Sequence, residues 1–139
     1  MAKAIQFNRE KAREVNKSKT FWYPSEEVEA VFEALSEPRE GKRVGKMKKD
    51  PWLLDVKIIN GIDKSDDEEI KLDNERRELV LNSKTVIESK FNDLIKQYNQ
   101  IKGKRFVIIG LGEEEGKEGT YVDYYIDTEE NARKEGVIA

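Results

Sequence analysis

The chain has 139 residues, 40% of them charged and 37% apolar, which suits one domain with a core and is too short for two well-packed domains. Cysteine and histidine are absent, which excludes disulfides, thiolate nucleophiles, Ser-His pairs and most transition-metal sites, and disfavours an enzyme. The sequence has no apolar run of the roughly 18 to 20 residues that cross a membrane. Because it also begins without the apolar run of a secretory signal, we expect an intracellular protein. High Lys, Glu and Arg without Cys follows the composition trend of heat-adapted proteins.

The formal net charge of −3 conceals a regular alternation of sign along the chain. Basic side chains outnumber acidic ones in residues 1–24, 41–57 and 79–112, and acidic side chains dominate the blocks between and after them. If the three basic segments converged on one face, that face would attract a polyanion. The alternative is that each block is an ordinary solvated surface.

Residues 1–23 are predicted to form a polar, basic N-terminal arm, partly helical at most. The arm ends in three adjacent aromatic residues before Pro24, which favours an extended backbone at Tyr23. Successive side chains of an extended segment alternate in direction, so at least one of Phe21, Trp22 and Tyr23 should be exposed. We expect Trp22 to be exposed and to contact a ligand. The alternative is that Trp22 plugs the fold or contacts another subunit.

Residues 27–35 fit a strand or a helix, because their apolar side chains satisfy both spacings. A strand is favoured by the turn residues that follow and by a second extended run at 52–59. That run is expected to end at Asn60-Gly61, a turn signal. The acidic stretch 63–73 predicts an exposed loop, and residues 78–82 predict a short third strand.

The most secure element is a helix that begins after Ser83, a good N-cap, and stops by Gly103. Its apolar residues recur at helical spacing throughout. A fourth strand is expected at 105–110 and a fifth at 120–126, joined by an acidic, glycine-rich loop. The last residues, 128–139, predict a polar, frayed tail in which Val137 and Ile138 could dock.

The order strand, strand, strand, helix, strand, strand resembles the oligonucleotide/oligosaccharide-binding (OB) fold, a five-stranded Greek-key β-barrel with its helix between the third and fourth strands. The likeness is carried by Leu79-Val80-Leu81, by Gly103-Lys104-Arg105-Phe106-Val107-Ile108 and by Gly119-Thr120-Tyr121-Val122-Asp123-Tyr124. These segments are similar to the second half of small single-stranded DNA-binding domains from archaea, phages and archaeal viruses.

The resemblance covers residues 24–127, which leaves the arm at 1–23 and the tail at 128–139 outside the barrel. It implies a mainly β fold with one helix. It also implies binding of single-stranded nucleic acid, DNA in the first place, with no sequence code and no catalysis. Bases would stack on aromatic rings, while Lys and Arg contact the phosphate backbone.

The strongest electrostatic candidates are five cations in the glycine-containing segment 41–51. Five cations so close together repel one another unless an anion lies between them. In the resemblance this loop borders the binding groove, whereas the alternative is an ordinary solvated loop. The five cations are Lys42, Arg43, Lys46, Lys48 and Lys49.

Three further cations, Lys102, Lys104 and Arg105, stand at the helix exit and the start of the fourth strand, and either extend this path or stabilise the helix carboxyl end. If Tyr124 points inward, strand alternation turns Tyr121 and Tyr125 outward as a platform for stacking. The alternative is that one of the two rings covers the end of the barrel. Trp52 stands beside the basic loop and could also stack on a base, although its phase within its strand favours the core.

The rival interpretation is a protein-interaction module that uses the same barrel, its acidic loops and the aromatic segment 21–23 to contact a partner or another copy. A nuclease would need carboxylates from different strands around magnesium, and no spacing singles out such a set. Gly110-Leu111-Gly112 precedes three glutamates, which would repel phosphate, and the acidic run at 66–69 lacks the glycine of a calcium loop. We therefore expect no cofactor and no dedicated metal.

Overall fold

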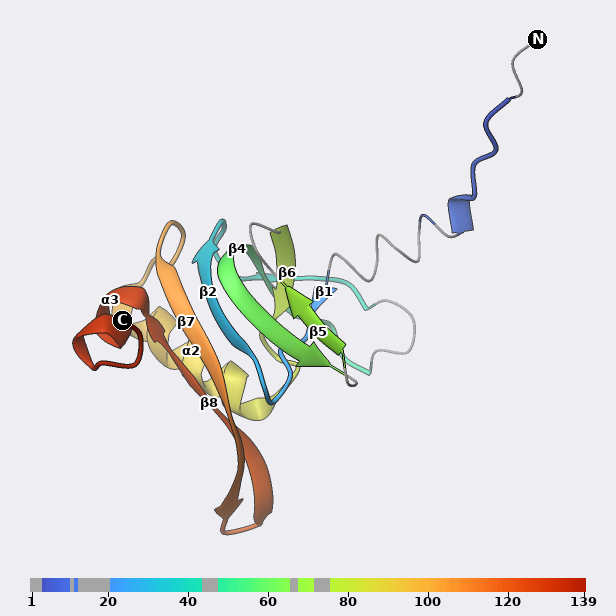
Figure 1. Ribbon diagram of the computed structural model, residues 1–139. Helices are drawn as coiled ribbons and strands as arrows, with labels where there is room; N and C mark the ends of the chain where they lie inside the picture. The colour runs from blue at the N-terminus through green and yellow to red at the C-terminus, as the bar shows by residue number, and fades with distance from the viewer. Residues whose placement is uncertain (1–3, 11, 13–20, 44–47, 66–67, 72–75) are drawn as a thin grey trace.

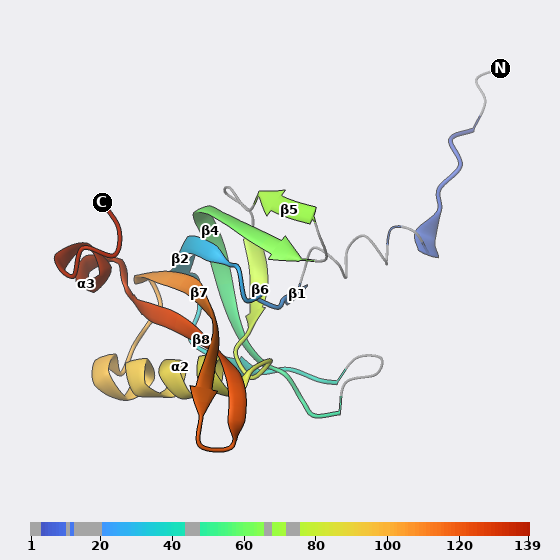
Figure 2. The same cartoon turned by 60° about the horizontal axis from the view of Figure 1, so that its bottom comes forward.

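The computed structural model describes residues 4–10, 12, 21–43, 48–65, 68–71 and 76–139 (Figure 1). Its main feature is a curled, open sheet with one long helix packed against its inner face (Figure 2). The strands are β1 (Phe21–Trp22), β2 (Glu29–Ala34), β3 (Arg39–Glu40), β4 (Trp52–Ser65), β5 (Glu68–Lys71), β6 (Arg76–Val80), β7 (Arg105–Gly116) and β8 (Gly119–Thr128). The helices are α2 (Thr85–Tyr98) and α3 (Glu129–Lys134).

The strands lie in the order β1-β6-β4-β2-β7-β8, and β3 and β5 pair with β4. Neighbouring strands are antiparallel except β1 and β6, which are parallel. The five predicted strands correspond to β2, β4, β6, β7 and β8, and the predicted helix to α2 between β6 and β7. The prediction of a mainly β fold is confirmed, and α3 is a second helix beyond the one predicted. In the described chain β6 and β8 do not pair, so the sheet stays open between them.

The hydrophobic core lies between the inner face of the sheet and α2. Phe32 of β2 and Phe106 of β7 stack with ring centroids 5.8 Å apart. Phe91 of α2 lies 6.3 Å from the first ring and 6.0 Å from the second. Each of these rings is fully buried, and such clusters contribute packing energy beyond their buried area.

No helix among the described residues is long and apolar enough to cross a membrane.

Tyr124 of β8 joins the two ends of the curled sheet. Its ring is fully buried, and its hydroxyl donates a hydrogen bond to the Pro24 carbonyl oxygen at 3.1 Å. The same hydroxyl accepts a hydrogen bond from Lys84 Nζ at 2.8 Å. The Lys90 ammonium, on α2, donates to the Tyr124 carbonyl and lies 3.5 Å from Asp123 Oδ1. These side chains hold β8 close to the segment that follows β1, although β1 and β8 are at opposite ends of the strand order.

A buried carboxylate, Asp63, fixes the start of the sheet. Its oxygens accept hydrogen bonds from Trp22 Nε1 at 2.9 Å, from the Ser25 backbone N–H at 3.2 Å and from the Ser25 hydroxyl. The Trp22 ring is thereby held in the core, edge-on to Phe32 with centroids 5.8 Å apart. The prediction that Trp22 is exposed is therefore wrong. Tyr23 is the exposed member of the aromatic trio, with 49% of its surface accessible.

The strand β4 continues through Asn60-Gly61, where the sequence predicted a turn. A Cβ at Gly61 would lie 2.6 Å from the Ala30 Cβ, so this glycine allows two strands to approach closely. The register of β2 against β4 also shifts between Val31 and Phe32. The prediction of an exposed loop at 63–73 is wrong in two places. Asp63 is buried, and residues 68–71 form the strand β5, which pairs with β4.

The helix α2 begins one residue later than its predicted cap implies. Lys84 occupies the N-cap position without a side-chain cap, and the Ser83 hydroxyl donates instead to the Val80 carbonyl at 3.0 Å. At the other end of the chain, the predicted frayed tail is wrong over α3. The Thr128 hydroxyl accepts a hydrogen bond from the Asn131 backbone N–H at 3.2 Å and caps that helix.

Replacing Tyr124 with Phe should lower the free energy of unfolding by about 1–3 kcal/mol, because the Pro24 carbonyl and the Lys84 ammonium lose a buried partner. Urea denaturation followed by circular dichroism measures this change. Tyr121→Phe is the matched control, since its ring is exposed, and it should shift stability by less than about 0.5 kcal/mol. Equal stability of the wild type and Tyr124→Phe would contradict the role of this hydroxyl.

Candidate nucleic-acid interface

The basic loop, residues 42–50, connects β3 with β4, and its two ends are joined to each other. The Gly41 N–H donates to the Pro51 carbonyl at 2.8 Å, and a Cβ at Gly41 would lie 2.7 Å from Leu53 Cδ1. The glycine therefore lets the base of the loop pack against the outer face of β4, the face that α2 does not cover. Lys46 lies outside the described residues. The described cations of the loop are all exposed: Lys42, Arg43, Lys48 and Lys49.

Asn82, just after β6, fixes the exit of the basic loop. Its Oδ1 accepts a hydrogen bond from the Trp52 backbone N–H at 3.0 Å, and its Nδ2 donates to the Asp50 carbonyl at 3.1 Å. Trp52 itself is half-buried and packs against the core, in phase with Leu54. Its ring therefore belongs to the inner face of the sheet, as its phase indicated, and the loop above it is anchored on both sides of Pro51.

The charges of the basic loop are only partly neutralised. Arg43 Nε lies 3.3 Å from Asp50 Oδ1, and its Nη1 donates to the Lys48 carbonyl at 3.3 Å. Within the described chain, no carboxylate lies in ion-pair range of Lys42, Lys48 or Lys49. Three solvated ammonium groups thus remain available to an anionic ligand.

Tyr23 is an exposed aromatic residue near the base of this loop. The strand register places Trp22 beside Leu79, which pairs with Leu54, and Tyr23 directly follows Trp22 at the end of β1. Neighbouring strands are about 4.8 Å apart, which puts the backbone of Trp22 about 10 Å from that of Leu54. Partial burial raises the pKa of Tyr23 above its ordinary value of 10.0. Sequence reasoning named the trio but chose the wrong ring, because the choice depends on the distant Asp63.

The cations at the helix exit are engaged locally. Lys104 Nζ lies 4.8 Å from the centroid of the Tyr98 ring, a cation–π contact. Arg105 lies 3.9 Å from a Glu33 carboxylate oxygen and 3.8 Å from a Glu129 oxygen. Both cations line a pocket of about 410 Å³ between the end of α2 and α3. Within the described chain, the contacts of these two cations are with residues around the pocket and not with the basic loop.

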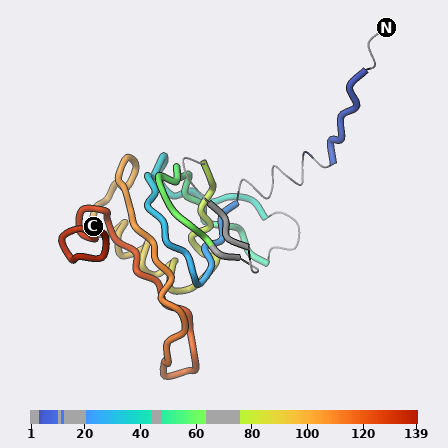
Figure 3. The backbone as a smooth tube through the Cα atoms, viewed as in Figure 1, coloured from blue at the N-terminus to red at the C-terminus, as the bar shows by residue number. Residues whose placement is uncertain are grey.

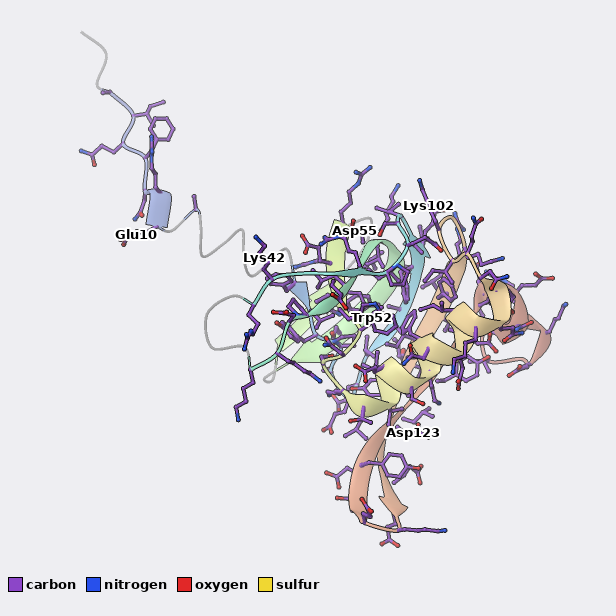
Figure 4. The ribbon with its side chains drawn as sticks, turned by 180° about the vertical axis from the view of Figure 1, so that it is seen from behind. Glu10, Lys42, Trp52, Asp55, Lys102 and Asp123 are labelled. Carbon is purple, nitrogen blue, oxygen red and sulfur yellow. The ribbon has the colours of Figure 1, made fainter. Side chains whose placement is uncertain are left out.

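Acidic side chains stand between the two groups of cations. Figure 4 shows Lys42 and Lys102 on separate parts of the surface, with Asp55 between them. Arg39 bridges Asp55 at 3.0 Å and Glu78 at 3.3 Å, and its hydrogen bond to Asp55 raises the pKa of the Arg39 guanidinium. The outer face of the sheet therefore carries paired charges where a single positive track was expected.

The strand β8 has the predicted alternation. Tyr124 and Ile126 are buried and Val122 packs against the core, so Tyr121 and Tyr125 point outward. Tyr121 is 43% exposed on the β7–β8 hairpin, which projects from the body (Figure 3). It pairs with Glu114 and is flanked along β7 by two more glutamates, which repel phosphate. Tyr125 is half-buried and its hydroxyl donates to Glu135 Oε2 at 3.2 Å.

Comparison with protein-family models, with curated proteins and with solved structures found no match. Among the residues that the structure describes, no cluster of three or more acidic side chains could hold a metal ion. The site is therefore defined by its own geometry. It consists of a clamped basic loop, three solvated ammonium groups and one exposed tyrosine nearby.

Tyr125 should ionise at a higher pH than an ordinary tyrosine. Partial burial and the hydrogen bond to Glu135 raise its pKa from 10.0 to about 12. Because the folded-state pKa lies above the unfolded value, this contribution to stability is complete below pH 10 and is lost as the pH rises towards 12. Ultraviolet titration of the wild type and Tyr125→Phe measures it. If Tyr125→Phe leaves the absorbance change near pH 12 as it is in the wild type, the assignment is wrong.

Proposed function

We propose that the protein binds single-stranded nucleic acid, DNA in the first place, without sequence specificity and without catalysis. The observation that carries the proposal is the clamped basic loop, which presents Lys42, Lys48 and Lys49 to solvent with no acidic partner among the described residues. Each ammonium that neutralises a phosphate releases a counterion, so such a loop gains affinity for any strand whatever its sequence.

The proposed contact surface is completed by Tyr23. A base stacked on an exposed ring contributes about 1 to 3 kcal/mol and requires no hydrogen-bond code. Tyr23 replaces Trp22 as the stacking residue of the aromatic trio, because Trp22 is buried. Tyr121 is less suited, since the glutamates beside it on the hairpin repel the phosphates that accompany a stacked base.

The order of the strands supports the finer part of the fold proposal. The strands β6, β4, β2, β7 and β8 follow one another in the sheet, with α2 inserted between β6 and β7. This is the order obtained when a Greek-key barrel of the OB type is opened between its third and fifth strands. We propose that the curled sheet is such an opened barrel, in which the Tyr124 hydroxyl takes the place of the missing strand pairing.

Neutralising the loop should weaken binding. The triple variant Lys42→Gln, Lys48→Gln, Lys49→Gln should bind labelled oligothymidylate roughly tenfold or more weakly in fluorescence anisotropy at moderate salt. The slope of log affinity against log salt should fall by about 2, since each lost phosphate contact to a single strand removes about 0.7.

The matched control removes the same amount of charge elsewhere, in the triple variant Lys96→Gln, Lys117→Gln, Lys134→Gln, all exposed in the structure. This control should keep the wild-type affinity within about twofold and keep the salt slope. If both triple variants lose affinity equally, the loop has no special role. If the wild type does not bind oligothymidylate, nucleic-acid binding is refuted. If it binds with an affinity that does not depend on salt, capture of the phosphates by the loop is refuted.

Tyr23→Ala should weaken binding of oligothymidylate by about 1–3 kcal/mol while leaving the salt slope unchanged, because stacking releases no counterions. Tyr121→Ala provides the comparison, since its ring is also exposed but stands among glutamates. The same anisotropy titration distinguishes them. A larger loss for Tyr121→Ala than for Tyr23→Ala would move the stacking site to the hairpin.

A further inference from the structure

An apolar groove of about 410 Å³ crosses the outer face of the sheet, where β2, β4 and β7 lie side by side. Its far wall is the segment after α3, which is held by the Val137 N–H donating to the Ala132 carbonyl at 2.8 Å. One charged residue, Glu29, lines it. The apolar lining is Val31, Ile62, Val107, Ile109, Val137 and Ile138.

The N-terminal arm carries two large apolar side chains that are mostly exposed to solvent. Ile5 is 78% exposed and Phe7 is 84% exposed. The backbone at residues 4–8 is neither helix nor strand. If this segment docks in an extended conformation, Ile5 and Phe7, two residues apart, point to the same side. In Figures 1 and 2 this part of the arm lies away from the sheet.

The arm and the groove are complementary in charge. Residues 1–24 carry six basic and two acidic side chains. The groove is lined by Glu29, and the preceding Glu26 and Glu27 are exposed at its β7 end, where the backbone of Glu26 closely approaches Gly110. A basic segment with paired apolar side chains therefore matches an apolar groove with an acidic rim.

We propose that Ile5 and Phe7 of one copy of the chain dock in the groove of a second copy. The occupant is a second copy because, within one chain, the described arm leaves both side chains in solvent. The arm and the groove are different surfaces, so each chain offers one of each, and the contact propagates head to tail into rings or open chains. This association needs no nucleic acid and does not depend on the proposed function.

The first experiment measures self-association of the full chain without nucleic acid, by sedimentation equilibrium. The wild type should associate with increasing concentration, and Phe7→Asp should weaken association at least roughly tenfold by placing a charge in an apolar site beside Glu29. Gln6→Asp adds the same charge on the opposite side of the extended arm and should retain association within roughly twofold. A wild type that stays monomeric, or equal losses in both variants, would overturn the proposal.

The second experiment tests the groove and the direction of docking. Glu29→Lys should weaken association by repelling the basic arm, whereas Glu118→Lys, the same change at the exposed hairpin tip, should not. A mixture of Phe7→Asp with Glu29→Lys should form dimers but nothing larger, because one intact arm and one intact groove remain. If the mixture stays monomeric while both variants keep the wild-type circular dichroism spectrum, docking between copies is excluded.

Discussion

The fold depends on one buried hydroxyl that bridges the two ends of a sheet which strand pairing leaves open. Tyr124 donates to Pro24 and accepts from Lys84, so a single phenol connects β8, the segment after β1 and the start of α2. A buried hydroxyl without partners would carry a desolvation penalty, so these hydrogen bonds stabilise the closed arrangement of the core. The Phe32, Phe91 and Phe106 cluster then fills the space that the closure encloses.

Because α2 and these rings fill the inner face, the proposed contacts with nucleic acid lie on the outside of the molecule and on its loops. The curl of the sheet separates the charges in space as well as in sequence. The basic loop leaves the β3–β4 end, the glutamates of β7 project on the hairpin, and Arg39 compensates Asp55 and Glu78 between them. A chain of net charge −3 can therefore present a locally positive surface to a polyanion.

Much of the fold was predictable because it depends on local periodicity. The alternation in β8 placed Tyr124 inward and Tyr121 outward, and the helical spacing of apolar residues located α2. The prediction of a turn at Asn60-Gly61 was wrong, because Gly61 allows two strands to approach each other closely and does not end the strand. Gly61 admits Ala30 in the middle of β4, and nothing within its own segment distinguishes that use from a turn. The candidate site was predictable in its loop cations and not in its aromatic residue.

The sequence by itself determined the class of the fold, the order of its main elements and the position of the basic loop, since each follows from neighbouring residues and their spacing. Only the tertiary structure decided which ring of the aromatic trio is exposed, because Trp22 is held by Asp63, 41 positions further along the chain. It also decided that Lys104 and Arg105 are occupied by Tyr98, Glu33 and Glu129. Such pairings are set by the three-dimensional path of the backbone, which brings distant residues together and leaves no local signature in the sequence.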